Sequence, residues 1–314
     1  MDNNKDLRHI QDEIEILRKK VKEGKKEYLP QLIKLRRQFK KLAKERISNM
    51  SAWEKVQLAR HPKRPHTIDY IENIFDDFIE LHGDRRFADD KSIVAGFAFF
   101  ENTPVCIIGQ EKGKDTKEKI ERNFGMPHPE GYRKAIRVMK LAEKFNRPVI
   151  TFVDTAGAYP GIGAEERGQS QAIAESIATM ADLKVPTIAV IIGEGGSGGA
   201  LAIAIGNRVL MLENAVYSVI SPEGCAAILY KTREKAPVAA ENLKMTANEL
   251  LELGVIDEIV REPLGGAHLQ PKKMYRLLRR ALRKNLKELQ NLSPEELVQQ
   301  REQKFYSIGQ FLEK

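Results

Sequence analysis

The sequence predicts an α/β core with helical extensions at both ends. Two successive segments repeat the order of apolar strand, glycine-containing loop and helix: strands at 149–153 and 187–192 lead into loops at 154–161 and 193–199. In repeated units of this kind the loops lie at the carboxyl ends of parallel strands, where ligands bind. Basic helical segments flank this core. We therefore expect an N-terminal basic helical arm at 1–50, the core at 51–268 and C-terminal basic helices at 269–314.

The other segments extend this fold in chain order. Apolar residues at helical spacing predict two helices between residues 5 and 48, broken near Pro30, and another helix at 67–81. The polar stretch at 110–131 has too few apolar residues for a core segment, and long loops of this type are often functional. The remaining expected strands are 92–100, 104–109, 208–212, 217–220 and 255–260, and the remaining long helices are 132–145, 165–180, 271–290 and 294–303.

Composition predicts a soluble protein of the cytoplasm. Of the 314 residues, 42% are hydrophobic and 31% charged, and no apolar run has the length of a membrane span. The first residues lack the apolar core of a signal peptide. Cys106 and Cys225 lie far apart in apolar surroundings, which indicates buried thiols. Two cysteines cannot build a four-cysteine zinc site and no HExxH spacing occurs, so we expect no metal.

Formal charge is uneven along the chain. Residues 1–50 hold 15 Lys and Arg against 8 Asp and Glu, and residues 271–290 hold 8 against 1. Each of these segments therefore has a net charge of +7, whereas the whole chain has a net charge of +8. The rest of the chain is mildly acidic. Charge alone would permit nucleic-acid binding, but no recognition motif accompanies it. We therefore expect solvated helix faces and no nucleic acid.

The glycine-rich loop at 193–199 fits more than one motif. Gly193, Gly195 and Gly198 have the spacing of a dinucleotide-binding fingerprint. No Lys-Ser/Thr pair follows the glycines, so a Walker A loop is excluded. A glycine-rich turn can also serve only to let a helix pack closely on a strand.

Two catalytic interpretations of the same loop remain. In the first, Ser197 lies in a Gly-x-Ser-x-Gly nucleophile elbow, with Asp257 and His268 following in the chain order of a serine hydrolase. In the second there is no nucleophile. The backbone amides at the start of the following helix then stabilise a negative charge that develops during the reaction.

Many ordered segments of the chain resemble the α subunit of bacterial acetyl-CoA carboxylase carboxyltransferase. The similarity extends over roughly residues 52–268, and its one departure is Ala156, where the family usually has proline. The segments that carry it are HGDR at 82–85, TKEKI at 116–120, RNFGMPHPEGYR at 122–133, GIGAEERGQ at 161–169, the glycine loop at 193–200, YSVISPEGC at 217–225 and EPLGGAH at 262–268.

The resemblance implies a crotonase-like fold, a spiral of ββα units in which backbone amides form oxyanion holes. It also implies a β subunit that shares the active site in an α2β2 assembly and carries the zinc. With that subunit, the family transfers a carboxyl group from carboxybiotin on biotin carboxyl carrier protein to acetyl-CoA. The product, malonyl-CoA, is the first committed intermediate of fatty acid biosynthesis. ATP is used by the biotin carboxylase of such complexes, and biotin is not attached to this chain.

The resemblance also assigns roles to residues of this chain. Gly195 and Gly196 are expected to donate their backbone amides to the biotin oxyanion, and Ser197 then only begins a helix. Asp257 and His268 become structural. The pocket is expected to include Gly157, Ala158, Gly198 and Gly199. From their charge, Lys112, Lys114 and Arg122 are candidates for contacts with the phosphates of coenzyme A.

Overall fold

A computed structural model describes residues 3–48 and 50–309. The helices are α1 (Asn3–Lys22), α2 (Leu29–Ser48), α3 (Ala52–Ala59), α4 (Thr67–Ile74), α5 (Thr116–Glu121), α6 (Pro129–Lys144), α7 (Ile162–Glu166), α8 (Gln169–Asp182), α9 (Ser197–Leu201), α10 (Pro222–Leu229), α11 (Ala236–Asn242), α12 (Ala247–Glu252), α13 (Pro271–Leu289) and α14 (Pro294–Tyr306). The strands are β1 (Asp76–Glu80), β2 (Ile93–Phe100), β3 (Thr103–Gln110), β4 (Val149–Thr155), β5 (Thr187–Gly196), β6 (Arg208–Leu212), β7 (Val216–Ser218) and β8 (Glu258–Val260).

One mixed sheet organises the body in the order β1-β2-β3-β4-β5-β6-β8, and β7 pairs with the far end of β5. Strand β2 pairs antiparallel with both β1 and β3, whereas β3, β4, β5, β6 and β8 run parallel. The central strands β4 and β5 are buried along almost their whole length, as expected for parallel strands covered on both faces. The carboxyl ends of β3, β4 and β5 therefore meet at one edge of the sheet.

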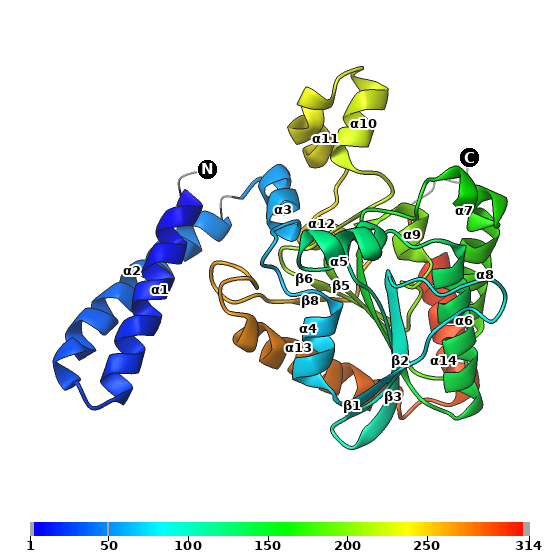
Figure 1. Ribbon diagram of the computed structural model, residues 1–314, viewed down its shortest axis with the longest axis horizontal. Coiled ribbons are helices and arrows are strands. Elements are labelled where there is room, and N and C mark those ends of the chain that lie inside the picture. Colours follow the sequence, from blue (N-terminus) through cyan, green and yellow to red (C-terminus); the bar gives the residue numbers. More distant parts are fainter. Residues whose placement is uncertain (1–2, 49, 310–314) are drawn as a thin grey trace.

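Helices cover both faces of this sheet. In Figure 1, α4 and α13 lie on one side of it, and α6 and α8 lie on the other. The apolar side of α13, including Met274, Leu278 and Leu282, joins the same core cluster as the strands. The C-terminal helices are thus packed into the body, although their surface is basic. Our division of the chain at residues 50 and 268 stays a proposal.

The N-terminal arm contains the two expected helices, α1 and α2, which pack together as a hairpin with its own small core. Its buried side chains include Leu7, Ile14 and Phe39, and these pack against Leu264 and Leu269 of the body. Figure 1 shows the hairpin extending away from the sheet. The apolar sides of α1 and α2 therefore cover each other in part, and the loop that precedes α13 covers a further part.

Three local predictions were wrong. The expected helix at 67–81 ends at Ile74, and the chain continues as β1, which pairs with β2. The expected helix at 165–180 is two helices, because Gly168 has a left-handed backbone with φ of 80°. The polar stretch at 110–131 is not one loop, since it contains α5 and the first turn of α6.

Candidate active site at the carboxyl edge of the sheet

The glycine-rich segment is the end of β5 rather than a separate loop. The strand, expected to end at residue 192, continues to Gly196, and α9 begins at Ser197 as predicted. Gly195 pairs with Thr155 of β4 and with Tyr217 of β7, whereas Gly196 pairs with Ser218 alone. Ser197 has a φ of 54°, so the chain turns sharply there. Gly195 is therefore enclosed by two neighbouring strands, and Gly196 stands at the rim.

Close contact with the segment after β4 requires two of these glycines. A Cβ at Gly196 would overlap the carbonyl group of Ala156, and a Cβ at Gly199 would lie 2.5 Å from the carbonyl carbon of Gly157. Both separations are far shorter than real Cβ contacts. Gly157 and Ala158 are thereby packed directly against Gly199.

Several backbone donors gather at this edge. The first N–H groups of α9 have no acceptor within the helix, which is general for helix N-termini. The N–H of Gly157 donates to Oγ1 of Thr155 at 3.1 Å. In the part of the chain that the structure describes, the N–H of Ala158 has no protein acceptor. The edge therefore presents backbone amide donors at and beside the turn at Ser197.

An apolar cavity of ≈ 340 Å³ opens beside this turn. Ser197 and Gly198 form one wall, and Tyr217 of β7 forms another. The rest of its lining comes from Leu201, Ser218, Val219, Leu243, Lys244, Leu250, Leu253 and Val255. A small ring system could be enclosed there with a polar edge turned towards the amides.

A buried ion network lies beneath the turn. Nζ of Lys112 lies 2.7 Å from Oδ1 of Asp154 and 3.3 Å from Oε2 of Glu194. Burial alone would lower the pKa of Lys112, but the two carboxylates outweigh it and hold the pKa above its usual value. Burial would raise the pKa of Asp154, but chiefly Lys112 and also His66 hold it below its usual value. This arrangement argues against the predicted contact between Lys112 and a phosphate of coenzyme A.

The network continues to the helices around the site. Arg60, which follows α3, lies 2.6 Å from Glu194 and 2.5 Å from Glu223 of α10. Nε of Arg64 donates to the carbonyl oxygen of Ile192 in β5 at 2.8 Å, and its guanidinium group pairs with the buried Glu262 at 2.5 Å. No sequence motif predicts a role for these two arginines. Their only signal was a basic cluster beside prolines, which is equally typical of an exposed turn.

The other two predicted basic contacts lie at the surface, Lys114 just before α5 and Arg122 just after it. Nζ of Lys114 lies 2.7 Å from Oδ1 of Asp69, with 56% of its side chain exposed. Nη1 of Arg122 donates to the carbonyl oxygen of Lys91 at 2.7 Å. Both cations keep part of their donor capacity directed towards solvent. The geometry therefore separates them from Lys112, which sequence alone could not do.

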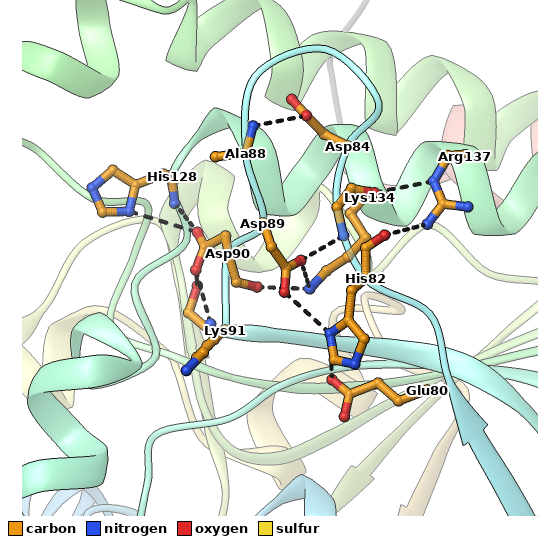
Figure 2. Close-up of polar contacts among 12 residues, drawn as sticks. Glu80, His82, Asp84, Ala88, Asp89, Asp90, Lys91, His128, Lys134 and Arg137 are labelled. Atoms are coloured by element: carbon orange, nitrogen blue, oxygen red, sulfur yellow. Dashed lines mark hydrogen bonds and ion pairs between the residues drawn. The ribbon is translucent and has the colours of Figure 1, made fainter.

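The HGDR segment is part of a loop fastened to α6, as Figure 2 shows. The fully buried Lys134 of α6 reaches Oδ1 of Asp89 at 2.7 Å and the carbonyl oxygen of Asp90 at 2.8 Å. Oδ2 of Asp90 accepts from the N–H of His128 at 2.6 Å, and Arg137 donates to the carbonyl oxygens of the 82–83 turn. These contacts fix the N-terminus of α6 and give the motif a structural role.

The serine-hydrolase triad is not assembled. Oδ2 of Asp257 accepts from the N–H of Val209 at 2.6 Å and pairs with Lys304 at 2.9 Å. Val209 lies near the amino end of β6, whereas Ser197 follows the carboxyl end of β5, which runs parallel to β6. Asp257 and Ser197 are therefore at opposite edges of the sheet. This separation argues against a serine hydrolase. It leaves the second interpretation, in which backbone amides stabilise a developing charge and no nucleophile is used.

Two further observations concern metals and membranes. Within residues 3–48 and 50–309, no group of three or more His, Cys, Asp or Glu side chains is placed to hold a metal ion. None of the described helices is both long and apolar enough to cross a membrane.

The mixed sheet with helices on both faces defines a crotonase-like α/β fold. Three solved structures share the fold. Transcarboxylase 12S matches with a TM-score of 0.58 and 20% identity, over 72% of this chain and 44% of that one. The β subunit of P. aeruginosa geranyl-CoA carboxylase matches with a TM-score of 0.56 and 19% identity, over 79% of this chain and 46% of that one. A Pseudomonas malonate decarboxylase hetero-tetramer in complex with coenzyme A matches with a TM-score of 0.57 and 17% identity, over 69% of this chain and 86% of that one.

Sequence relatives make the assignment narrower. A family model described as acetyl co-enzyme A carboxylase carboxyltransferase-like matches residues 1–309. The acetyl-coenzyme A carboxylase carboxyl transferase subunit alpha of Aquifex aeolicus is 57% identical over 98% of this chain and 95% of its own. The corresponding subunit of Thermus thermophilus is 58% identical over 89% of each chain. The chain belongs to the family of acetyl-CoA carboxylase carboxyltransferase α subunits.

Proposed function

We propose that, together with a β subunit, this chain transfers the carboxyl group of carboxybiotin to acetyl-CoA and so forms malonyl-CoA. The observation that carries the proposal is the rim of β5, where backbone amides lie beside an apolar cavity and no catalytic triad is assembled. Membership of the family supports the same reaction. The product places the protein at the first committed step of fatty acid biosynthesis.

In this proposal the backbone at the end of β5 stabilises negative charge on the substrate. Carboxybiotin supplies the carboxyl group, and its ureido oxygen gains negative charge as that group leaves. Gly196 stands at the rim, so we assign its N–H as the main donor, with Gly195 beside it. A donor of this kind contributes about 3 kcal/mol to transition-state stabilisation. Of the four residues expected in the pocket, Gly198 lines the cavity, and we propose that Gly157, Ala158 and Gly199, which pack against one another beside the turn, extend the same site.

The apolar surface beside the site supports a protein partner. The segment around α10 and α11 projects from the body in Figure 1 and exposes Val219, Ile228, Leu229 and Val238. An apolar patch of this kind next to a site is typical of an interface. We propose that the β subunit docks there in an α2β2 assembly and completes the active site.

The remaining components follow from the family's reaction. We propose that biotin arrives on biotin carboxyl carrier protein and is not attached to this chain. Biotin carboxylase uses the ATP, and zinc belongs to the β subunit. A cytoplasmic location fits the two free thiols of Cys106 and Cys225.

Reconstitution tests the proposal. The purified chain and a cognate β subunit are mixed with carboxylated carrier protein and acetyl-CoA, and malonyl-CoA is measured. We expect product only when both chains are present. A complex that forms but makes no malonyl-CoA would refute the proposed function.

Contacts with coenzyme A can be tested in the same assay. We propose that Lys114 and Arg122 bind its phosphates. Removing either cation should raise KM for acetyl-CoA severalfold and leave kcat unchanged, because the lost interaction is the same in the ground and transition states. Lys117→Ala removes an exposed cation from α5, the helix between these two residues, and serves as the control. An equal rise in KM for all three variants would mean that the loss of positive charge, and not a specific phosphate contact, raises KM. That result would contradict the proposed contacts.

A further inference from the structure

The side chain of Gln110 joins the two strand–loop–helix units of the site. Gln110 is the last residue of β3 and is fully buried. Its Nε2 donates to the carbonyl oxygen of Gly199 in α9 at 2.7 Å. Its Oε1 accepts from the backbone N–H of Asp154 in β4 at 3.0 Å. One carboxamide therefore spans from the base of the 155–158 segment to the first turn of α9.

The chemistry of these contacts allows one orientation of the carboxamide. Rotating it by half a turn would place the NH₂ group against the N–H of Asp154 and the oxygen against the carbonyl of Gly199. Both contacts would be repulsive, and the buried groups would lose their partners. The backbone of Gln110 is itself fixed, because its carbonyl oxygen accepts from Oγ1 of Thr67 at 2.5 Å. The side chain is thus a rigid spacer, and its place requires one donor and one acceptor at the end of a side chain of this length.

We propose that Gln110 is a positioning residue for the oxyanion site: it holds the amides after β4 and those after β5 at a fixed separation. It does not touch substrate, because it is fully buried beneath the turn. The proposal rests on the proposed function, which makes those amides the catalytic donors. Geometric errors of about 1 Å in such donors can reduce rates by about 10²-fold.

Two variants and one matched control test the role. Gln110→Met keeps the length of the side chain and removes both hydrogen bonds. The control is Asn207→Leu, because Asn207 is also a buried carboxamide that bridges backbone groups, at the amino end of β5. Its Oδ1 accepts from the N–H of Thr187 at 3.3 Å and from Nη1 of the buried Arg301 at 2.7 Å, and its Nδ2 donates to the carbonyl oxygen of Leu297 at 2.7 Å. Both variants lose a buried carboxamide that contacts the backbone of the sheet, and only Gln110 adjoins the site.

The measurements are kcat and KM in the reconstituted complex, with the denaturant midpoint of each variant. We expect Gln110→Met to lower kcat by about 10- to 100-fold with KM for acetyl-CoA changed less than about 2-fold. Asn207→Leu should lower the midpoint at least as much, because the buried Arg301 also loses an acceptor, and should leave kcat within about 2-fold of wild type. A normal kcat for Gln110→Met, or an equal kcat loss in both variants, would overturn the proposal.

Gln110→Glu gives a readout that a general structural defect would not produce. When protonated, the introduced carboxyl group can donate to Gly199 and accept from Asp154, as the amide does. When ionised, it has no proton to donate and repels the Gly199 carbonyl. The ratio of its kcat to that of wild type should therefore rise as pH falls from about 8 to about 6, the range in which a buried carboxyl group titrates.

The wild-type complex measured at each pH corrects this ratio for the ionisable groups already present. Charged and titratable side chains near Gln110 include Glu111 and Lys112, which follow it in the chain. The others are Asp154 on β4, Glu194 on β5 and His66 before α4. A ratio that does not change with pH would contradict the spacer role. An inactive wild-type complex would instead refute the proposed function itself, so the two failures are distinguishable.

Discussion

Gly196→Ala is the most direct test of the rim of β5. The added methyl group would overlap the carbonyl of Ala156 and lie 3.0 Å from the carbonyl oxygen of Thr155. Neither neighbour is the flexible end of a side chain, so the backbone of one segment has to move. Relief of an overlap this severe needs a displacement on the order of 1 Å, the scale at which about 10² in rate is lost.

The expected loss can be expressed as free energy. A 10²-fold fall in kcat corresponds to about 2.7 kcal/mol in the activation barrier. The overlap should also lower the free energy of unfolding by about 1–3 kcal/mol, the usual cost of overpacking. The two quantities are measured separately, by malonyl-CoA formation in the reconstituted complex and by denaturant unfolding of the isolated chain.

Gly163→Ala in α7 is the matched control. A Cβ there would meet only the guanidinium end of Arg167, which is flexible, at 3.1 Å. We expect kcat within about 2-fold of wild type and a small gain in stability, because alanine favours helix by up to about 1 kcal/mol. If Gly196→Ala were folded and as active as this control, the amides at the rim of β5 would not be the catalytic donors.

Three further outcomes are expected. Lys112→Met should lower the free energy of unfolding by about 3 kcal/mol, because it leaves a buried carboxylate unpaired, and adding Asp154→Asn should recover part of that loss in a double-mutant cycle. Ser197→Ala should retain malonyl-CoA formation within about 3-fold, and complete loss would revive the nucleophile interpretation. Although burial opposes it, contacts led by Lys134 lower the pKa of Asp89 to about 2 from a usual value of 3.8. The stability gained from this ionised pair is therefore complete above pH 3.8 and is lost as pH falls towards 2, and Lys134→Met should make acid unfolding curves flatter in that window.

Sequence periodicity predicted the central strands and the long helices because their burial is set by local pattern. It failed at β1, where Phe75, Phe78 and Ile79 have helical spacing but the chain pairs with β2 instead. The helix ends at Ile74 without a glycine or proline to mark the change. Pairing with a distant strand decided that segment, and no single-sequence pattern reports such a partner.

The candidate site shows a similar division. The glycines, the turn at Ser197 and the neighbouring segment at 157–158 were identified from spacing and resemblance, and the structure brings them together. The polar support beneath them was not identified. In the sequence Lys112 is one of several lysines in a polar stretch, and Gln110 is an ordinary residue at a strand end. What distinguishes them is burial against β4 and β5, which exists only after the sheet forms.

The packing and catalytic interpretations of the glycines prove to be connected. Gly196 and Gly199 lack a Cβ because the backbone after β4 passes directly over them. That close approach brings the amides of the two segments to one point, which side chains of any size would prevent. Buried ion pairs cost desolvation energy and add little stability, so the Lys112 network is better explained as fixing this geometry than as strengthening the fold. A turn built only for packing would need neither the unpaired N–H of Ala158 nor an open cavity beside it.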